Sequence, residues 1–433
     1  MPAHLLLFAA LAAGGEAHLR RLLTQTTGVV DLPAGTFEIV SEIQLPQHVK
    51  QLHIRGHDTV IRAGHGFRGR ALLSSKFAAG LQISSLTLAG GRNFTTNPTQ
   101  GLPPYNQSFA GFYAGHGILI ERGEQVTLTG LTLSDVAGMA ILINQSNHVT
   151  IEGATILRSG SKGPKGRNNT TGGILLEEGT ADFAVRGCRL TDILGNGIWT
   201  HSLYTSARNA RGQIVGNTFH NIGRDAIQVG HATEVQVTRN TGSHIGYPAE
   251  IVDVEGGGTP VGIDTAGNVD RSVYANNQFQ DINGKCIDLD GFHDGEVTSN
   301  TCESVAHYGI VMNNTNPDMQ SANIRIAGNS IRKARYGGIF VIGTGHVIRD
   351  NVLQELNTAR CESGKAGCVY LATDPEMLLA GIYLGRGAER PAPNQGNTIM
   401  GNTITGYKMD RHCITAAPGV SLKSQRIAGN TCK

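Results

Sequence analysis

The feature that most constrains this chain is a turn residue that recurs at a nearly fixed interval in its second half. The residue is asparagine, and several of the gaps between its successive occurrences are 22 or 23 residues long: Asn217, Asn240, Asn277, Asn300, Asn329, Asn351, Asn402 and Asn430. The same turn residue recurring at a fixed period is typical of a solenoid. Inserted loops explain the longer gaps. Because asparagine tolerates the left-handed turn conformation and its amide can bond to the same residue one turn away, we expect a ladder.

A second pattern recurs between these turns: a small residue, Ile, a variable residue, an apolar residue and another variable residue. It occupies residues 197–201, 226–230, 262–266, 286–290 and 309–313. Side chains of a strand alternate between its two faces, so Ile and the residue two positions later point inward. The variable positions point outward and form the candidate surface for chemistry: Trp199, His201, Gln228, Asp264, Asp288, Asp290 and Asn313.

Composition agrees with a chain of short strands and many tight turns. Of the 433 residues 58 are Gly, while aromatic residues make up 5% and charged residues 16%, which argues against a helical bundle and against disorder. A net charge of +2 is too small to indicate nucleic acid or an anionic membrane as the main partner. No later stretch reaches the roughly 20 apolar residues of a transmembrane helix. The oligomeric state stays open.

The N-terminus predicts an exported protein. An apolar run over residues 5–13 is followed by small residues up to Ala17, a pattern typical of a signal peptide over residues 1–17. We therefore expect a secreted or periplasmic protein whose folded domain covers residues 18–433. The alternative is that this segment begins a capping helix that continues through residue 23.

The cysteines do not resemble a disulfide framework. There are seven of them, and no CxxC pair indicates zinc. Cys361 and Cys368 could close a loop in an oxidising compartment. The others are predicted to be small core residues: Cys188, Cys286, Cys302, Cys413 and Cys432.

Acidic residues gather on the outward face. If residues 262–266 and 286–290 form consecutive turns of the solenoid, Asp264 and Asp288 lie side by side about 4.8 Å apart, with Asp290 two residues further on. Like charges placed opposite each other in a sheet repel. Such a cluster predicts either a proton held between carboxyl groups or a bound cation, and the alternative is a set of ordinary surface acids.

Both arrangements have chemical uses. A pair of carboxyl groups can cleave a glycosidic bond as acid and base or as acid and nucleophile. A calcium site also fits, because residues 288–296 are dense in oxygen ligands, although they lack the spacing of an EF-hand. The predicted catalytic residues are Asp264, Asp288, Asp290, Asp225 and His201, since a histidine beside carboxylates can shuttle protons.

Other residues are candidates for binding sugar. Trp199 is the only Trp in the chain, and at an outward position it could stack against a sugar ring or pack under a loop. The remaining predicted substrate-binding residues are Gln228, His231, Glu177, His293 and Asn313.

Two segments resemble known proteins. Residues 32–37, Leu-Pro-Ala-Gly-Thr-Phe, resemble the entry to right-handed parallel β-helix proteins of the pectate lyase and polygalacturonase superfamily. This resemblance implies an all-β, single-stranded right-handed parallel β-helix with an N-terminal capping helix that covers the open end of the solenoid. Residues 223–227, Gly-Arg-Asp-Ala-Ile, resemble the G-D-D-C-I element of polygalacturonase-like glycoside hydrolases, with Asp225 matching the second Asp and Arg224 replacing the first.

The resemblance covers the fold and carries over one carboxylate. The N-T-D and G-H-G elements of polygalacturonases have no clear counterpart, and neither the R-x-P-x-x-R run of pectate lyases nor the D-P-H-D run of alginate epimerases occurs. No specific family is identified.

Three functions follow as hypotheses. The first is a glycoside hydrolase that cleaves a poly- or oligosaccharide in a surface groove with paired Asp residues. The second is a polysaccharide lyase on uronic acid polymers, with Ca²⁺ or the basic residues Lys285, Arg224 and Arg271 neutralising the substrate. The third is a non-catalytic glycan-binding β-helix. Unless calcium is present, the acidic groove favours the hydrolase, because it would repel an anionic substrate.

Overall fold

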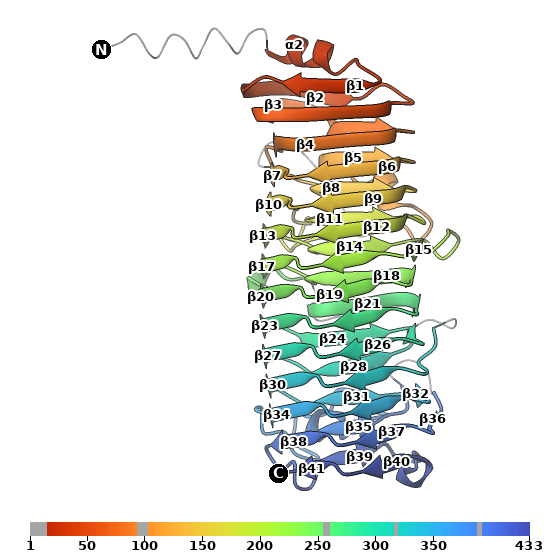
Figure 1. Cartoon of the computed structure of the whole chain (residues 1–433). Helices are drawn as coiled ribbons and strands as arrows, with labels where there is room; N and C mark the ends of the chain where they lie inside the picture. The colour runs from red at the N-terminus through yellow and green to blue at the C-terminus, as the bar shows by residue number, and fades with distance from the viewer. Residues whose placement is uncertain (1–14, 93–102, 254–259, 316–318, 388–391) are drawn as a thin grey trace. The chain divides into compact units, whose positions relative to one another are not determined.

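The chain is built almost entirely of short parallel strands that stack in layers (Figure 1). The computed structural model describes residues 15–92, 103–253, 260–315, 319–387 and 392–433. These residues divide into two compact units, Met1–Gln213 and Ile214–Lys433, and each is described by itself. No helix within the described ranges is long and apolar enough to cross a membrane.

The first unit begins with helix α2 (Gly15–Leu22), which confirms the predicted capping helix. Leu19 is fully buried, and the Arg20 guanidinium donates to the backbone oxygens of Ser41 (2.8 Å) and Glu42 (3.1 Å), so the helix is fixed to β2 (Gly35–Gln44). Residues 1–14 of the predicted signal peptide lie outside the described residues, and the signal peptide stays a prediction.

The other elements of the first unit are the long strands β3 and β4, several shorter strands and one helical turn. They are β1 (Gly28–Leu32), β3 (Lys50–Lys76), β4 (Ala79–Ala89), α3 (Phe109–Phe112), β5 (His116–Glu121), β6 (Glu124–Thr129), β7 (Thr132–Ser134), β8 (Ile141–Asn144), β9 (Asn147–Glu152), β10 (Thr155–Leu157), β11 (Ile174–Glu177), β12 (Ala181–Arg186), β13 (Arg189–Ile193), β14 (Ile198–His201) and β15 (Asn209–Ala210).

In the second unit three strands make each turn, and equivalent strands of successive turns stack into three columns. Column A holds β18 (Ile227–Thr233), β21 (Val261–Asp270), β24 (Lys285–Asp290), β28 (Ile310–Asn313), β31 (Ile339–Val341), β35 (Ile382–Leu384) and β39 (Ile414–Ala416). Column B holds β16 (Gln213–Val215), β19 (Gln236–Thr238), β22 (Val273–Ala275), β26 (Glu296–Thr298), β29 (Arg325–Ala327), β33 (Val347–Arg349), β37 (Thr398–Met400) and β40 (Arg426–Ala428).

The third column completes each turn. Column C holds β17 (Thr218–Ile222), β20 (Thr241–Ile245), β23 (Gln278–Ile282), β27 (Thr301–Val305), β30 (Ser330–Ala334), β34 (Val352–Leu356), β38 (Thr403–Gly406) and β41 (Thr431–Cys432). Shorter elements lie in the connections: η1 (Ala249–Ile251), β25 (Phe292–His293), β32 (Gly343–Thr344), η3 (Met377–Leu379), β36 (Asn394–Gln395) and η4 (Leu422–Ser424).

The register of column A follows the repeated Ile predicted from the sequence. Ile227 pairs with Ile263, Ile263 with Ile287, and Ile287 with Ile310, and all four side chains are buried. Because alternate side chains face opposite ways, burial of this row directs the variable positions away from the core. The register therefore aligns the outward residues of successive turns.

The predicted asparagine ladder is present. From Asn217 to Asn430, each side-chain amide donates to the Oδ1 of the next asparagine at 2.8–3.0 Å. The same Oδ1 also accepts the backbone N–H of the preceding asparagine, as Asn240 does from Asn217 at 3.0 Å. These asparagines lie where column B joins column C. Their hydrogen-bonding groups are thus satisfied by the asparagine of the next layer.

The prediction for the cysteines was wrong in part. The loop-closing pair Cys361–Cys368 is present, but Cys286–Cys302 and Cys413–Cys432 are also disulfides, and Cys188 is a buried thiol outside these three bonds. Cys286 precedes Ile287 in column A, and Cys302 lies in column C of the same turn. The sequence does not show which strands of one turn face each other across the interior.

Candidate functional site

Three carboxylates meet on adjacent turns of column A. The pairing of Ile263 with Ile287 aligns Asp264 with Asp288 on the next strand. Asp225 lies two residues before β18, and its Oδ1 accepts the backbone N–H of Val261 at 2.8 Å, which holds it against the start of β21. The register thus places Asp264 beside Asp288, as predicted, and this hydrogen bond adds Asp225, which was not predicted to join them.

The carboxylates perturb one another. Burial, followed by the charge of Asp288, raises the pKa of Asp225 to about 6, although the Arg224 guanidinium opposes this shift. Burial and the charges of Asp225 and Asp288 raise the pKa of Asp264 well above its usual range. Asp264 is partly exposed, and Gln228 donates to its Oδ2 at 2.7 Å. Asp264 is thus a partly exposed carboxyl group whose surroundings favour its protonated form.

The negative charge of Asp288 is compensated by a lysine on the same strand. The Lys285 ammonium donates to Asp288 Oδ2, and both side chains are buried. Burial opposes the charge of Lys285, but the Asp288 carboxylate outweighs it and raises the pKa of Lys285. The other oxygen, Asp288 Oδ1, is buried without a hydrogen-bond partner among the described residues. Lys285 therefore supplies the positive charge within the cluster.

Asp290 is the second partly exposed carboxylate of the cluster. It lies two residues beyond Asp288 on β24 and pairs with Asn313 of the next strand, as predicted. Its Oδ1 accepts the backbone N–H of Thr315 at 2.8 Å. Burial, together with the charge of Asp288, raises its pKa to about 6. Asp264 and Asp290 thus present two carboxyl groups that differ in how readily they lose a proton.

Two aromatic residues beside the cluster were missed by the sequence analysis. His307 lies in the turn from column C to column A, and its ring is 5.0 Å from that of Tyr370 and 5.2 Å from that of Tyr336. Burial, then the charges of Lys285 and Arg335, lowers the pKa of His307 to about 4, so it is neutral at physiological pH. Tyr370 follows the Cys361–Cys368 loop and is 42% exposed. Neither residue belongs to the repeated pattern, and no motif in the sequence marks them.

Comparison with known proteins identifies the fold. A family model described as a right-handed β-helix region matches residues 106–269. The chain is a right-handed parallel β-helix. No curated protein is a significant match to this β-helix.

Solved structures of several kinds share this fold. The surface adhesin PfbA of Streptococcus pneumoniae superposes with a TM-score of 0.53 at 16% identity, covering 79% of this chain and 86% of PfbA. A GH136 lacto-N-biosidase from Eubacterium ramulus has a TM-score of 0.51 at 14% identity, covering 90% of this chain and 64% of that one. The Dettilon tailspike protein has a TM-score of 0.51 at 13% identity, covering 95% and 65%. At these identities the likeness shows the fold alone, and this chain spans about two thirds of the last two proteins.

Trp199 is not the exposed sugar platform that was predicted. In the first unit of the β-helix it is 6% exposed and packs with Phe109, Tyr113, Met139 and other apolar residues. Its ring meets that of Phe109 edge to face at 4.6 Å. The reason is that α3, which lies in an insertion before β5, folds over the outward face of β14. The alternative of packing under a loop was the correct one.

Glu177 was predicted to bind substrate, but it anchors α3 instead. Its Oε2 accepts the N–H of Phe109 at 2.9 Å, and its Oε1 accepts the N–H of Ala110 at 2.7 Å and the Asn144 amide at 3.0 Å. The side chain is fully buried, and burial raises its pKa to about 7 despite these hydrogen bonds. Glu177 is therefore a structural residue.

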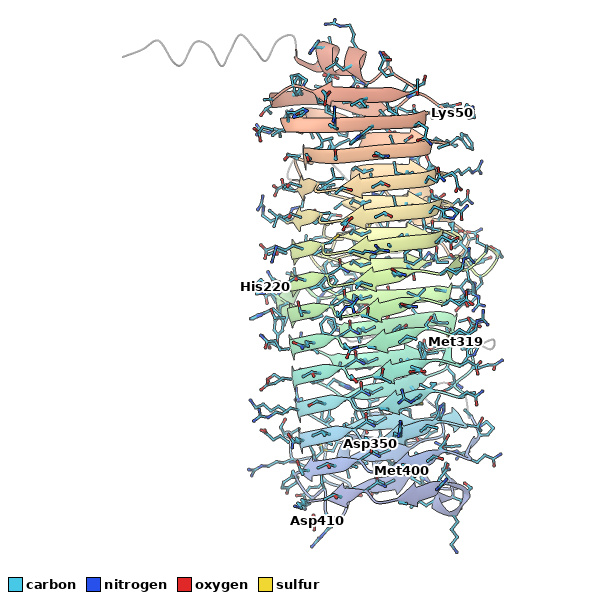
Figure 2. The ribbon with its side chains drawn as sticks, viewed as in Figure 1. Lys50, His220, Met319, Asp350, Met400 and Asp410 are labelled. Carbon is cyan, nitrogen blue, oxygen red and sulfur yellow. A yellow bond between two sulfur atoms is a disulfide. The ribbon has the colours of Figure 1, made fainter. Side chains whose placement is uncertain are left out.

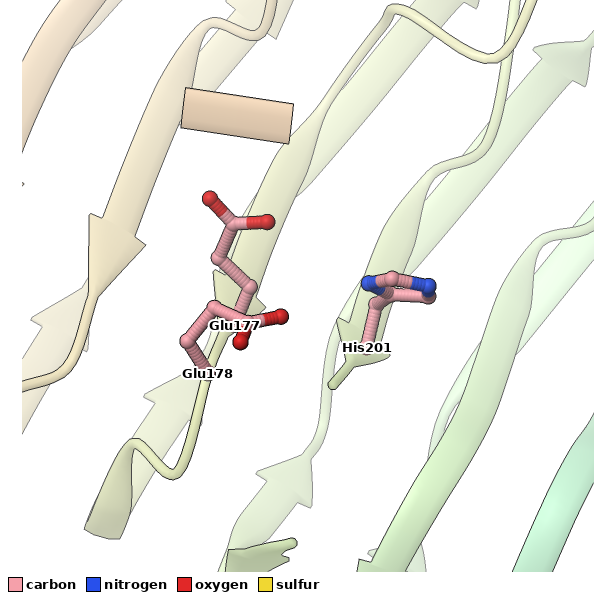
Figure 3. Close-up of side chains that lie close together, drawn as sticks. All are labelled: Glu177, Glu178 and His201. Atoms are coloured by element: carbon pink, nitrogen blue, oxygen red, sulfur yellow. The ribbon is translucent and has the colours of Figure 1, made fainter. Parts of the chain in front are cut away.

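Glu177, Glu178 and His201 bring one potential metal-ligand atom each within 4.8 Å of one another (Figure 3). The two carboxylates already accept hydrogen bonds from the protein. Glu178 accepts the N–H of Leu203 at 3.0 Å and the hydroxyl of Ser206. Together with the contacts of Glu177, these bonds leave all four carboxylate oxygens engaged with protein donors. The donor set therefore fits an anchor for two loops better than a metal centre.

The predicted histidines have different surroundings. His201 lies in the first unit, with its ring 4.8 Å from Phe109 and 5.4 Å from Trp199, and its approach to the carboxylates of the second unit stays a prediction. His231 is buried within β18, which gives a sugar little surface to contact. His293 is within hydrogen-bond distance of Asn268 Oδ1 (3.0 Å) and Asp294 Oδ2 (2.8 Å), so both ring nitrogens are engaged.

The oxygen-rich segment 288–296 does not gather its carboxylates at one point. Asp294 accepts the Asn323 amide at 2.8 Å, and Glu296 pairs with Arg325 at 3.1 Å on the exposed face of column B. Asp288 and Asp290 lie on β24 in column A instead. The segment therefore does not fit the predicted calcium site, because its ligands point to different neighbours.

Proposed function

We propose that this β-helix is a glycoside hydrolase that cleaves a poly- or oligosaccharide at the carboxylate cluster of Asp225, Asp264, Asp288 and Asp290. The observation that carries the proposal is the raised pKa of Asp264, which stays partly exposed beside two further carboxylates. Hydrolysis of a glycosidic bond requires one carboxyl group that holds a proton and another that is ionised.

The two partly exposed carboxyl groups take these roles. Asp264 is the general acid that protonates the leaving oxygen. Asp290, whose pKa is about 6, is ionised at neutral pH and acts as base or nucleophile. Asp225 and Asp288 are buried and act through their charge, which raises the pKa of Asp264. Gln228 orients the acid through its hydrogen bond.

The lyase hypothesis has less support. Lys285 is committed to Asp288, and Arg271 pairs with Asp270 at 2.8 Å and with Glu234 at 3.4 Å. Two of the three basic residues predicted to neutralise a uronate are therefore already paired. The charge of the third, Arg224, acts on the cluster by lowering the pKa of Asp225.

We also propose that the protein is exported. Disulfides form and persist mainly in oxidising compartments, and three of them lie in the second unit. This supports the predicted signal peptide over residues 1–17 and a secreted or periplasmic protein.

The test is digestion of a panel of glycans by the wild type and Asp264→Asn, with and without EDTA. The matched control is Asp350→Asn, which changes an exposed carboxylate in a column B to column C turn (labelled in Figure 2). We expect new reducing ends with the wild type and the control, and at least a hundredfold loss in Asp264→Asn. Products that absorb as unsaturated uronides would instead establish a lyase, and equal rates for all three proteins would overturn the assignment of Asp264.

A further inference from the structure

The second unit contains a cavity whose wall includes none of the four carboxylates of the cluster. It has a volume of about 390 Å³ and lies at the ends of the column C strands, with Tyr247, Asp281, Ser304, Ala306, Arg335 and Thr358 in its wall. Small-molecule sites usually have volumes of about 300–1,000 Å³ and combine apolar surface with a few polar groups. The cavity is therefore large enough for a sugar residue.

The cavity adjoins the carboxylate cluster through His307. Ala306 lines the cavity, and the next residue, His307, packs against Tyr336 and Tyr370 beside the cluster. The charges of Lys285 in the cluster and Arg335 in the cavity both act on the His307 ring. His307 is thus close enough to both places for its ring to be affected by the charge of each.

The two charged residues in the cavity wall, Asp281 and Arg335, differ in whether they already have a partner. Asp281 is already engaged, because His244 lies 3.2 Å from its Oδ2 and the Tyr247 hydroxyl donates to its Oδ1 at 3.2 Å. The Arg335 guanidinium lies over the Tyr336 ring at 5.4 Å. Among the residues that the structure describes, no carboxylate pairs with Arg335, although its neighbours Arg332 and Lys333 both have acidic partners. The cavity therefore holds a positive charge that can receive an anion.

Aromatic rings lead to this cavity along the outward side of column C. The ring of His220 (labelled in Figure 2) lies 5.1 Å from that of His244, which in turn lies 6.0 Å from that of Tyr247. Rings of this kind offer the flat, partly apolar surface against which a sugar ring packs. An anionic group beside such a wall would be held by Arg335 and oriented by the ring of Tyr247.

We propose that the cavity is a remote subsite that binds an acidic sugar residue of the substrate, with Arg335 pairing to its carboxylate and Tyr247 packing against its ring. This inference rests on the proposed function and adds a substrate class to it: an oligosaccharide that carries a uronic acid away from the bond to be cleaved. A carboxylate at Arg335 avoids the repulsion that it would meet at the acidic cluster.

Binding to the full-length Asp264→Asn protein tests the proposal without turnover. The probes are uronic acid oligosaccharides from pectate, alginate and glucuronoxylan, each paired with its carboxyl-reduced form, and the measurement is titration calorimetry. We expect at least one acidic probe to bind, with binding at least tenfold weaker after carboxyl reduction and after adding Arg335→Gln. Arg332→Gln, three residues earlier on β30, is the matched control and leaves binding unchanged, because Arg332 pairs with Glu355 at 2.7 Å and does not line the cavity.

The outcomes separate this inference from the proposed hydrolase. Equal binding of acidic and reduced probes, no binding of any acidic probe, or full binding by Arg335→Gln would overturn the subsite. Hydrolysis that Arg335→Gln leaves at the same KM would also overturn it while the hydrolase stands. Arg335-dependent binding without cleavage by the wild type would keep the subsite and reject the hydrolase. Unchanged thermal unfolding of Arg335→Gln confirms that the variant is folded.

Discussion

The ammonium of Lys285 donates to Asp288 three residues later on the same strand, and both groups are buried. In an extended strand, residues three apart point to opposite faces, and Lys285 forms this pair from the first position of β24. The pair places one positive charge inside a cluster of four carboxylates. It is thus the main compensation for the negative charge of the site.

Removal of Lys285 is expected to destabilise the protein. Lys285→Met leaves Asp288 buried without its partner, and breaking a buried pair in this way costs about 3–5 kcal/mol of unfolding free energy. The double variant Lys285→Met with Asp288→Asn should recover much of this loss, since no buried charge then remains unpaired. Chemical unfolding of the wild type, both single variants and the double variant measures the coupling. Additive losses would show that the two residues do not act as a pair.

The carboxylate cluster is expected to make stability depend on pH. The pKa of Asp225 rises from 3.8 to about 6 on folding, so the folded state binds the proton more tightly. Its contribution to stability is fully present below about pH 4 and is lost as the pH rises through about 6. Asp225→Asn, which keeps an Oδ1 acceptor for Val261, should therefore be more stable than the wild type at neutral pH by about 1–3 kcal/mol.

The control for this prediction is a carboxylate outside the cluster. Asp350→Asn should change stability little at either pH, because Asp350 is exposed. The thermal unfolding midpoints of the three proteins at neutral pH and at about pH 4 are the measurement. A gain for Asp225→Asn that persists unchanged in acid would contradict the electrostatic explanation.

The asparagine ladder is expected to be most costly to break in its middle. Asn300 donates to the carbonyl of Tyr274 at 2.8 Å and to Asn329 at 3.0 Å, and it accepts from Asn277. Asn300→Ala leaves buried donors and an acceptor unsatisfied, each at about 1–3 kcal/mol, so we expect a total loss of roughly 3–5 kcal/mol.

Asn430, at the end of the ladder, is partly exposed, and water can replace its bonds. Asn430→Ala should therefore cost less than about 1 kcal/mol. Denaturant unfolding of both variants gives the comparison, and equal losses would mean that the ladder is not what stabilises the central turns.

Loss of Glu177 is expected to release α3 from the first unit. Glu177→Ala removes the acceptor for the Phe109 and Ala110 amides, so the helix should loosen and water should reach Trp199. Because Trp199 is the only Trp, its fluorescence emission reports this directly and should shift to the red. The control is Glu152→Ala, an exposed acid on β9, which should leave the emission unchanged. Unshifted emission in Glu177→Ala would show that α3 is held by its apolar contacts alone.

The periodic part of the structure could be predicted from the sequence, and the irregular part could not. Ile263 and Ile287 set the register of column A, and the spacing of Asn277 and Asn300 sets the length of a turn. Both follow from rules that apply along one strand. The alignment of Asp264 with Asp288 follows from the same register, which is why the centre of the site was found.

The surroundings of the site depend on contacts that no local rule describes. Trp199 stands at an outward position, but an insertion that begins far from it in sequence covers its ring. His307 and Tyr370 come together because a loop closed by Cys361 and Cys368 returns to column A. Burial of outward residues thus arises from the insertions, whose lengths are visible in the sequence while their paths are not.

The sequence distance between successive ladder asparagines ranges from 22 to 51 residues, yet the amide bonds that join them stay at 2.8–3.0 Å. The ladder therefore joins successive turns in the same way, however many residues each turn contains. Segments can lengthen at the other corners without shifting the carboxylates out of alignment. Such an arrangement lets evolution, or a protein engineer, rebuild the loops one at a time while the aligned carboxylates keep their places.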